Sequence, residues 1–178
     1  MLREILLFLG LAAVGLAGCN QHSASSPSPQ PKGPAIAAGE IGSHLPDFSM
    51  KDLRGRKISS ADLRGKVVLI DFWATWCQPC KKEMPGYQKL LDRYGPRGFV
   101  VVGLKFNTMK DMEDPVMFAK RLGVRYPLAV ATDALKQEFG GIEGLPTTML
   151  YDRQGMLRNK IIGFEYTDTI ESDLKPLL

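Results

Sequence analysis

Residues 66–85 read Lys-Val-Val-Leu-Ile-Asp-Phe-Trp-Ala-Thr-Trp-Cys-Gln-Pro-Cys-Lys-Lys-Glu-Met-Pro. The apolar run over 67–72 is typical of a strand that is buried on both faces. The segment 77–94 has the apolar spacing of a helix. Cys77 and Cys80 therefore fall in the first turn of a helix that follows a buried strand. Two thiols in one helical turn can close into a disulfide and reopen by exchange, so the stretch predicts a redox site.

The place of each cysteine in this turn predicts its role. A helix N-terminus carries unsatisfied N–H groups and the positive end of the helix dipole, which stabilise a thiolate. Cys77 lies at that end and is the expected nucleophile, and Cys80 is placed to resolve a mixed disulfide. Pro79 fits the first turn, where its missing N–H costs nothing. Trp73 and Trp76 are expected to form an apolar rim beside an exposed Cys77 sulfur.

Two carboxylates accompany the thiols. Asp71 interrupts an apolar run, and burial without a partner would raise its pKa. It is then a candidate base for the Cys80 thiol, or else a structural acid that is bonded to water or to a lysine. Glu83 lies one turn beyond Cys80 and is a second candidate base. Because Lys81 and Lys82 precede it, a solvated surface position for Glu83 is the alternative.

The string Asp-Phe-Trp-Ala-Thr-Trp-Cys-Gln-Pro-Cys-Lys at 71–81 resembles the thioredoxin superfamily. Glu83 together with Pro85 resembles its membrane-tethered TlpA/ResA/DsbE branch. A later stretch, Gly-Leu-Pro-Thr-Thr at 144–148, matches the position of the superfamily's cis proline. The resemblance implies that the Leu145–Pro146 bond is cis, that Pro146 packs against the disulfide, and that the backbone beside it pairs with an extended substrate. Residue 71 is Asn in some members of this branch, so which carboxylate is the base stays open.

The implied fold class is α/β. The resemblance predicts a thioredoxin-like domain over 45–178, with a central mixed sheet flanked by helices, an N-terminal hairpin, and a central αβ insertion at about 107–140. Strand, helix and strand over 67–106 form a parallel βαβ unit. Asp168 and Glu171 resemble the capping box of a last helix. The other expected elements are strands at 128–131 and 156–162, a helix that opens at Asp114 and ends at Gly123, and a short helix at 133–139.

Other uses of a cysteine pair compete with disulfide exchange. A structural zinc site needs four ligands, and the sequence has no Cys and no His after Cys80, so no metal site is expected. Peroxiredoxins resemble this fold but carry a Thr three residues before their Cys, whereas Thr75 stands two residues before Cys77. No bound cofactor is implied. A disulfide-donating oxidase, a peptide- or metal-binding module and a thiol peroxidase remain alternatives to a reductase.

The N-terminal residues resemble a bacterial lipoprotein signal. Apolar residues from Ile5 to Leu16 precede Leu-Ala-Gly-Cys, which resembles a lipobox that ends at Cys19. A signal peptide at 1–18, a lipidated Cys19 and a Ser/Pro-rich tether over 19–44 are therefore expected. A plain secretory signal or a short anchor is the alternative. Lipid anchoring would place the protein outside the cytoplasmic membrane, in the periplasm or cell envelope.

Composition agrees with one soluble domain on such an anchor. The chain has 178 residues and a formal net charge of +4, without a block of Lys or Arg, so nucleic-acid binding is not expected. The resemblance implies a thiol:disulfide oxidoreductase that acts on protein disulfides or thiols. Its expected direction is reduction, with apocytochrome c haem-site cysteines among the candidate clients. A reductase in an oxidising compartment needs a membrane electron donor as a further partner.

Overall fold

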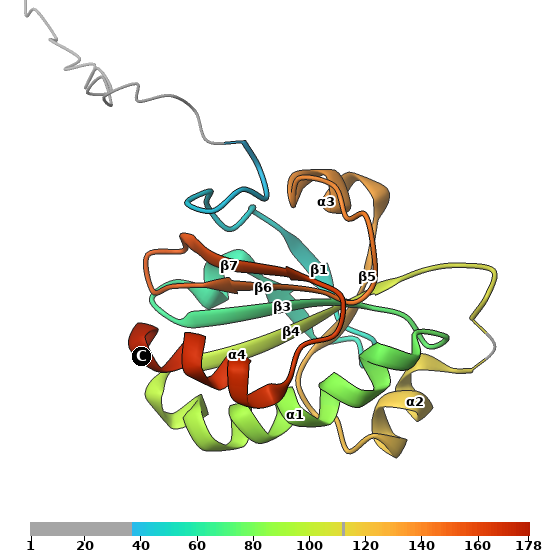
Figure 1. Ribbon diagram of the computed structural model, residues 1–178. Coiled ribbons are helices and arrows are strands. Elements are labelled where there is room, and N and C mark those ends of the chain that lie inside the picture. The colour runs from blue at the N-terminus through green and yellow to red at the C-terminus, as the bar shows by residue number, and fades with distance from the viewer. Residues whose placement is uncertain (1–36, 112) are drawn as a thin grey trace, which may run out of the picture. The chain divides into compact units, whose positions relative to one another are not determined.

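The structure is a computed structural model that describes residues 37–111 and 113–178. The predictions for the signal segment, Cys19 and most of the tether lie outside the described residues. At the centre is a five-stranded mixed sheet in the order β5-β4-β3-β6-β7 (Figure 1). Parallel pairing joins β3 to β4 and β4 to β5, and antiparallel pairing joins β3 to β6 and β6 to β7. These strands are β3 (Val67–Trp73), β4 (Phe99–Phe106), β5 (Leu128–Ala131), β6 (Thr147–Tyr151) and β7 (Leu157–Ile162).

Helices cover both faces of the sheet. Figure 1 shows α1, α2 and α4 on one side of it and α3 on the other. The predicted α/β fold class with a mixed central sheet is therefore confirmed. The helices are α1 (Gln78–Tyr94), α2 (Pro115–Arg121), α3 (Asp133–Glu138) and α4 (Thr167–Leu174), and short 3-10 turns occupy Ser60–Leu63, Gly95–Arg97 and Lys175–Leu177. Among the described residues, no helix is long and apolar enough to cross a membrane.

The central strand β3 divides the apolar core in two. All seven of its residues are buried. Because side chains alternate along a strand, Leu69 and Trp73 join the core beneath α1, whereas Ile70 and Phe72 join the core on the opposite face. Asp71 lies between Leu69 and Trp73 in this alternation, so its carboxyl group is on the α1 side, the side that carries the cysteines.

The N-terminal hairpin is present as predicted. Strands β1 (Ser49–Lys51) and β2 (Lys57–Ser59) pair antiparallel. The backbone before them is also bonded to the domain: the Gly42 N–H donates to the Leu157 carbonyl at 2.8 Å, and the Leu45 N–H donates to the Gly155 carbonyl at 2.8 Å. Contacts of the domain therefore begin a few residues before the predicted boundary at Leu45.

The expected capping box of the last helix is not formed. Helix α4 begins at Thr167, its N-cap residue is Tyr166, and no side chain caps it. Glu171 instead accepts hydrogen bonds from Tyr94 and from the Arg93 guanidinium, the latter at 2.7 Å. The carboxylate is drawn to donors on α1 rather than to the N-terminus of its own helix, so it links α4 to α1.

Candidate active site

The two predicted cysteines form a disulfide at the N-terminus of α1. Their Cα atoms are 5.3 Å apart. Cys77 is the N-cap residue, and its sulfur accepts a hydrogen bond from the Cys80 N–H at 3.3 Å. Pro79 occupies the first turn as expected. Cys77 is only 2% exposed, so the prediction of an exposed sulfur is wrong for this oxidised state.

Only one of the two expected tryptophans lies at the rim of the site. Trp76, in the loop between β3 and α1, is 39% exposed. Trp73 is the last residue of β3, is fully buried, and stacks on Phe118 of α2 with ring centroids 5.2 Å apart. The expected double rim is therefore wrong, because strand alternation turns Trp73 into the core beneath α1.

An ion pair between buried Lys105 and half-buried Asp111 holds the loop that precedes Cys77. The Lys105 ammonium donates to Asp111 Oδ2 at 2.6 Å, and the Thr75 hydroxyl donates to Asp111 Oδ1 at 2.5 Å. The Trp76 indole N–H donates to the Thr108 hydroxyl at 2.8 Å. Burial alone would raise the pKa of Asp111, but the hydrogen bonds from Lys105, Thr75 and the Thr108 N–H lower it below the ordinary value. The segment after β4 thus fixes both residues that lead into the disulfide.

The proline loop lies beside the same core. The Leu145–Pro146 bond is cis, as the resemblance implied. Leu145 packs against the core cluster that contains both cysteines. The Pro146 carbonyl accepts a hydrogen bond from the Gly163 N–H at 2.8 Å, which ties this loop to the end of β7.

Asp71 is fully buried on the cysteine side of the sheet. Both of its oxygens lack a hydrogen-bond partner among the described residues, so no lysine there satisfies it. Its strand neighbours are Gly103 on β4 and Thr148 on β6, and the Tyr87 phenol of α1 hydrogen-bonds the Thr148 hydroxyl at 2.9 Å. Burial, reinforced by the Glu83 charge, raises the pKa of Asp71 well above its ordinary value. Asp71 is therefore a buried carboxyl group with a raised pKa, as its place in an apolar run predicted.

Glu83 is not the solvated residue of the alternative interpretation, because it is 2% exposed. Its Oε1 accepts a hydrogen bond from the Glu165 N–H at 2.6 Å, and its Oε2 lacks a partner among the described residues. Burial raises the pKa of Glu83 to about 7, although the Glu165 N–H and the nearby Tyr87 hydroxyl act in the opposite direction. A carboxyl group with this pKa can both give and take a proton near neutral pH.

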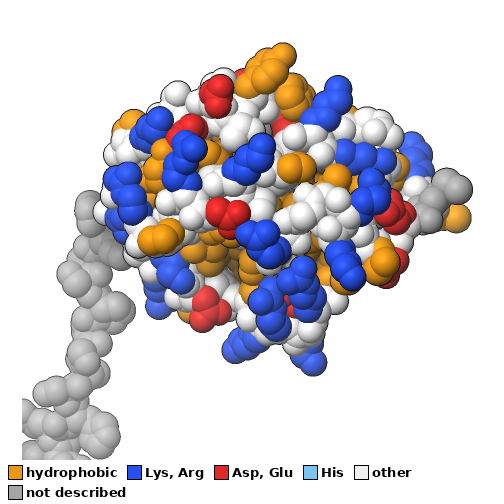
Figure 2. All heavy atoms as spheres, turned by 90° about the horizontal axis from the view of Figure 1, so that it is seen from below, with side chains coloured by type: hydrophobic (Ala, Val, Ile, Leu, Met, Phe, Trp, Pro, Cys, Tyr) orange, Lys and Arg blue, Asp and Glu red, His pale blue; other side chains and the backbone are white. Residues whose placement is uncertain are grey.

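The lysines next to Cys80 have different surroundings. Lys81 is half-buried, with its ammonium 5.8 Å from the Phe118 ring centroid, and Lys82 is exposed. Figure 2 looks onto the side of the molecule that α1 covers and shows more Lys and Arg than Asp and Glu side chains there. Lys82 is therefore solvated, whereas Lys81 is only partly so.

Comparison with known proteins identifies the family. Residues 41–160 match the family model described as AhpC/TSA. The chain belongs to the AhpC/TSA family. Within it, the chain is 35% identical over 142 residues to the thiol-disulfide oxidoreductase ResA of Bacillus thuringiensis, covering 78% of this chain and 79% of the relative. It is also 35% identical over 123 residues to the thioredoxin-like protein YneN of Bacillus subtilis, covering 68% and 71% of the two chains.

A solved structure agrees with these relatives. A thiol:disulfide interchange protein of the thioredoxin family from Chlorobium tepidum superposes with a TM-score of 0.70 at 31% identity, covering 79% of this chain and 99% of that one. This AhpC/TSA family member is accordingly a thioredoxin-like thiol-disulfide oxidoreductase of the ResA/DsbE type. The Cys pair at the start of α1 and the buried carboxyl groups of Asp71 and Glu83 lie on the same side of the sheet.

Two features of the site were not predicted from the sequence. The first is the Lys105–Asp111 ion pair; the signal for it was a lysine inside the apolar strand 99–106, which requires a buried partner. The second is Tyr126, whose buried phenol lacks a partner among the described residues and belongs to the same core as the cysteines. An isolated Tyr before Pro127 gave no sequence signal for either its burial or its place.

Asp111→Asn is expected to lower the free energy of unfolding by about 2 kcal/mol, because it leaves the Lys105 charge buried without its counter-ion. The loss should be greatest near neutral pH and shrink in acid, where protonation of Asp111 also removes the pair. Urea unfolding of the wild type and of Asp111→Asn at pH 7 and pH 3 measures this loss. Asp133→Asn removes an exposed carboxylate that pairs with Lys136 and is the control. A loss as small as that of the control would show that the buried pair does not stabilise the loop.

Proposed function

We propose that this oxidoreductase reduces disulfides of client proteins outside the cytoplasmic membrane. The observation that carries the proposal is the Cys77–Cys80 pair at the start of α1, in a chain that is 35% identical to a thiol-disulfide oxidoreductase. The dipole of a long helix and the first-turn N–H groups favour a thiolate at Cys77 in the reduced state. A stabilised thiolate is both the attacking group and the better leaving group.

The reaction divides into two exchanges. In the first, the Cys77 thiolate attacks the client disulfide, forms a mixed disulfide with one client sulfur, and releases the other as a thiolate. In the second, the Cys80 thiol gives up its proton and attacks the Cys77 sulfur, which forms the Cys77–Cys80 disulfide and releases the second client sulfur. Two electrons pass to the client in all. A membrane thiol donor must then return two electrons to the Cys pair.

Glu83 is the proposed base for the second exchange. With a pKa of about 7, a substantial fraction of Glu83 is ionised at neutral pH and can take the Cys80 proton. Asp71 lies deeper, and burial beside the Glu83 charge favours its protonated form. Asp71 is therefore proposed to hold its proton while Glu83 acts as the base.

The extracytoplasmic position depends on Cys19. Acylation of the Cys19 thiol would consume it as a thioether and leave Cys77 and Cys80 as the redox pair. More than one acyl chain gives stable membrane attachment. Growth of the bacterium with a labelled fatty acid tests this. Label in the wild-type chain and none in Cys19→Ala supports the anchor; equal labelling contradicts it.

The client class is tested with a peptide that contains Cys-x-x-Cys-His, the haem attachment motif of c-type cytochromes, in its disulfide form. The reduced full-length chain with Cys19→Ser should reduce this peptide stoichiometrically, as followed by mass spectrometry of alkylated thiols. If the peptide stays oxidised while glutathione disulfide is reduced, these haem-site cysteines are not the clients. If neither is reduced, the reductase proposal is wrong.

A further inference from the structure

Two aromatic side chains are exposed on the connection between β7 and α4. Phe164 is 41% exposed and Tyr166 is 70% exposed. Their ring centroids are 5.1 Å apart in an edge-to-face arrangement. Ile162 at the end of β7 is exposed as well. Single exposed apolar residues are ordinary, but an exposed pair of touching aromatics beside a reactive site is characteristic of a binding surface.

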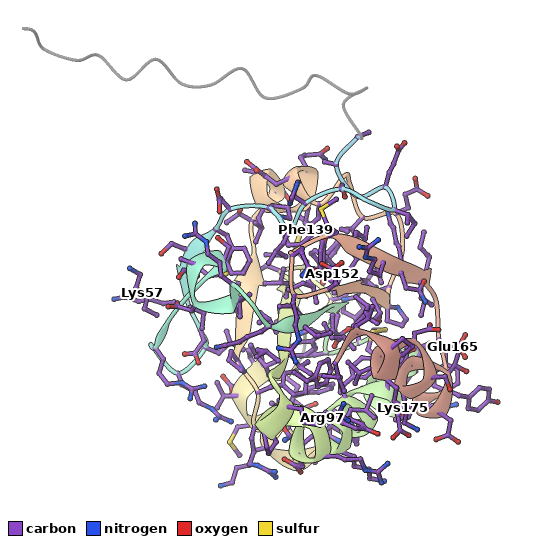
Figure 3. All side chains as sticks on the ribbon, turned by 90° about the vertical axis from the view of Figure 1, so that its left-hand side faces the viewer. Lys57, Arg97, Phe139, Asp152, Glu165 and Lys175 are labelled. Carbon is purple, nitrogen blue, oxygen red and sulfur yellow. A yellow bond between two sulfur atoms is a disulfide. The ribbon has the colours of Figure 1, made fainter. Side chains whose placement is uncertain are left out.

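The backbone of this connection is bonded directly to the candidate active site. The Gly163 N–H donates to the Pro146 carbonyl, and the Glu165 N–H donates to Glu83. These two residues alternate with Phe164 and Tyr166, so the bonded amides hold the backbone that carries the aromatic pair next to the proline loop and Glu83. Figure 1 shows the connection at the same end of the sheet as the start of α1, and Figure 3 shows Glu165 at the surface beside α4.

Carboxylates accompany the aromatic pair along the chain. Glu143, which precedes the proline loop, and Asp168, in the first turn of α4, are exposed and form no ion pair among the described residues. Glu165 lies between the two aromatics. In the loop that precedes Cys77, by contrast, the exposed ring of Trp76 has the Lys110 ammonium 5.3 Å from its centroid. The part of the site that includes Phe164 and Tyr166 thus complements a basic, apolar ligand.

We propose that Phe164 and Tyr166 form a client-docking surface for an extended polypeptide that carries an aromatic side chain and a basic residue beside its cysteine. The client ring packs on the two exposed rings, and its basic residue faces Glu143, Glu165 and Asp168. This inference rests on the proposed reduction of client proteins and adds a substrate preference to it. Desolvation of aromatic rings supplies most of the energy of such contacts, and charge complementarity supplies selectivity.

The test uses three disulfide peptides that differ only in the two residues next to the first cysteine. These residues are Phe-Lys, Ser-Lys or Phe-Glu. The second-order rate constant for reduction by the reduced full-length chain is measured for each, and for glutathione disulfide. The wild type should reduce the Phe-Lys peptide roughly 3- to 10-fold faster than the Ser-Lys peptide. The Phe-Glu peptide should be slower than the Phe-Lys peptide, most clearly at low salt.

The double variant Phe164→Ser/Tyr166→Ser should lose the preference for Phe over Ser and keep its rate with glutathione disulfide. Ile41→Ser is the matched control, because Ile41 is an exposed apolar residue close to the opposite end of β7. An unchanged peptide preference in the double variant overturns the docking surface, as does equal reduction of all three peptides by the wild type. Failure of the wild type with all three peptides and with glutathione disulfide overturns the proposed reductase instead, so the two failures are distinguishable.

Discussion

Cys80→Ser is expected to trap a covalent complex between Cys77 and the client. The variant keeps the attacking thiolate but has no thiol that can displace the client from Cys77, so the reaction stops after the first exchange. Turnover should fall by at least roughly 10³-fold. Non-reducing electrophoresis and intact mass spectrometry, with an excess of client disulfide, should show one client per chain, and dithiothreitol should release it.

The matched variant is Cys77→Ser, which removes the attacking sulfur. It should lose turnover to a similar extent and should form no mixed disulfide, because Cys80 lies inside the first turn and lacks the N-cap position that favours a thiolate at Cys77. A trapped complex in Cys77→Ser but not in Cys80→Ser would reverse the assigned roles. Unchanged biological activity of Cys77→Ser would favour a binding module, and peroxide turnover that depends on Cys77 would indicate a thiol peroxidase.

Glu83→Gln is expected to stabilise the oxidised protein by about 3 kcal/mol above pH 7. Burial raises the pKa of Glu83 from the ordinary 4.5 to about 7 in the folded state. Between these values the folded protein holds a proton that the unfolded chain has released, so the free energy of unfolding falls as the pH rises. Because Gln cannot ionise, the variant does not lose this free energy of unfolding as the pH rises. Its amide oxygen can still accept the hydrogen bond from the Glu165 N–H.

Urea unfolding at pH 5 and pH 8 measures this effect. The gain should be small at pH 5 and large at pH 8. Glu143→Gln, which removes an exposed carboxylate, should give the same small change at both pH values. A pH-independent effect of Glu83→Gln would contradict the raised pKa. The same variant should slow release of the client from the mixed disulfide by roughly 10²-fold at pH 7; an unaltered rate would assign the base role to Asp71.

The stretch 66–85 was predictable because its pattern is local. A continuous apolar run requires a buried strand, and two cysteines three residues apart on the following helix must meet in its first turn. The cis bond before Pro146 came from family resemblance, since no local rule distinguishes it from an ordinary proline at a strand edge. The burial of Asp71 followed from its place in a strand that has no exposed position.

Contacts between distant segments were not predictable in the same way. Glu83 is buried because the connection after β7 covers it and supplies the Glu165 amide, which is 82 residues away in the chain. Helical spacing alone could not distinguish that position from a solvated one. The sequence pattern gave Trp73 and Trp76 the same expected position. Because β3 ends between them, Trp73 enters the core and Trp76 stays at the rim.

The most direct test of the reductase account is the reduction potential of the Cys77–Cys80 pair. The full-length chain with Cys19→Ser, which leaves only this pair to titrate, is equilibrated with glutathione or dithiothreitol buffers, and the oxidised fraction is measured at pH 7. A reductase should have a potential near or below about −230 mV, in the range of thioredoxin-like reductants. A value near −120 mV is that of a strong oxidant and would contradict reduction as the physiological direction. A pair that does not cycle reversibly would contradict disulfide exchange itself.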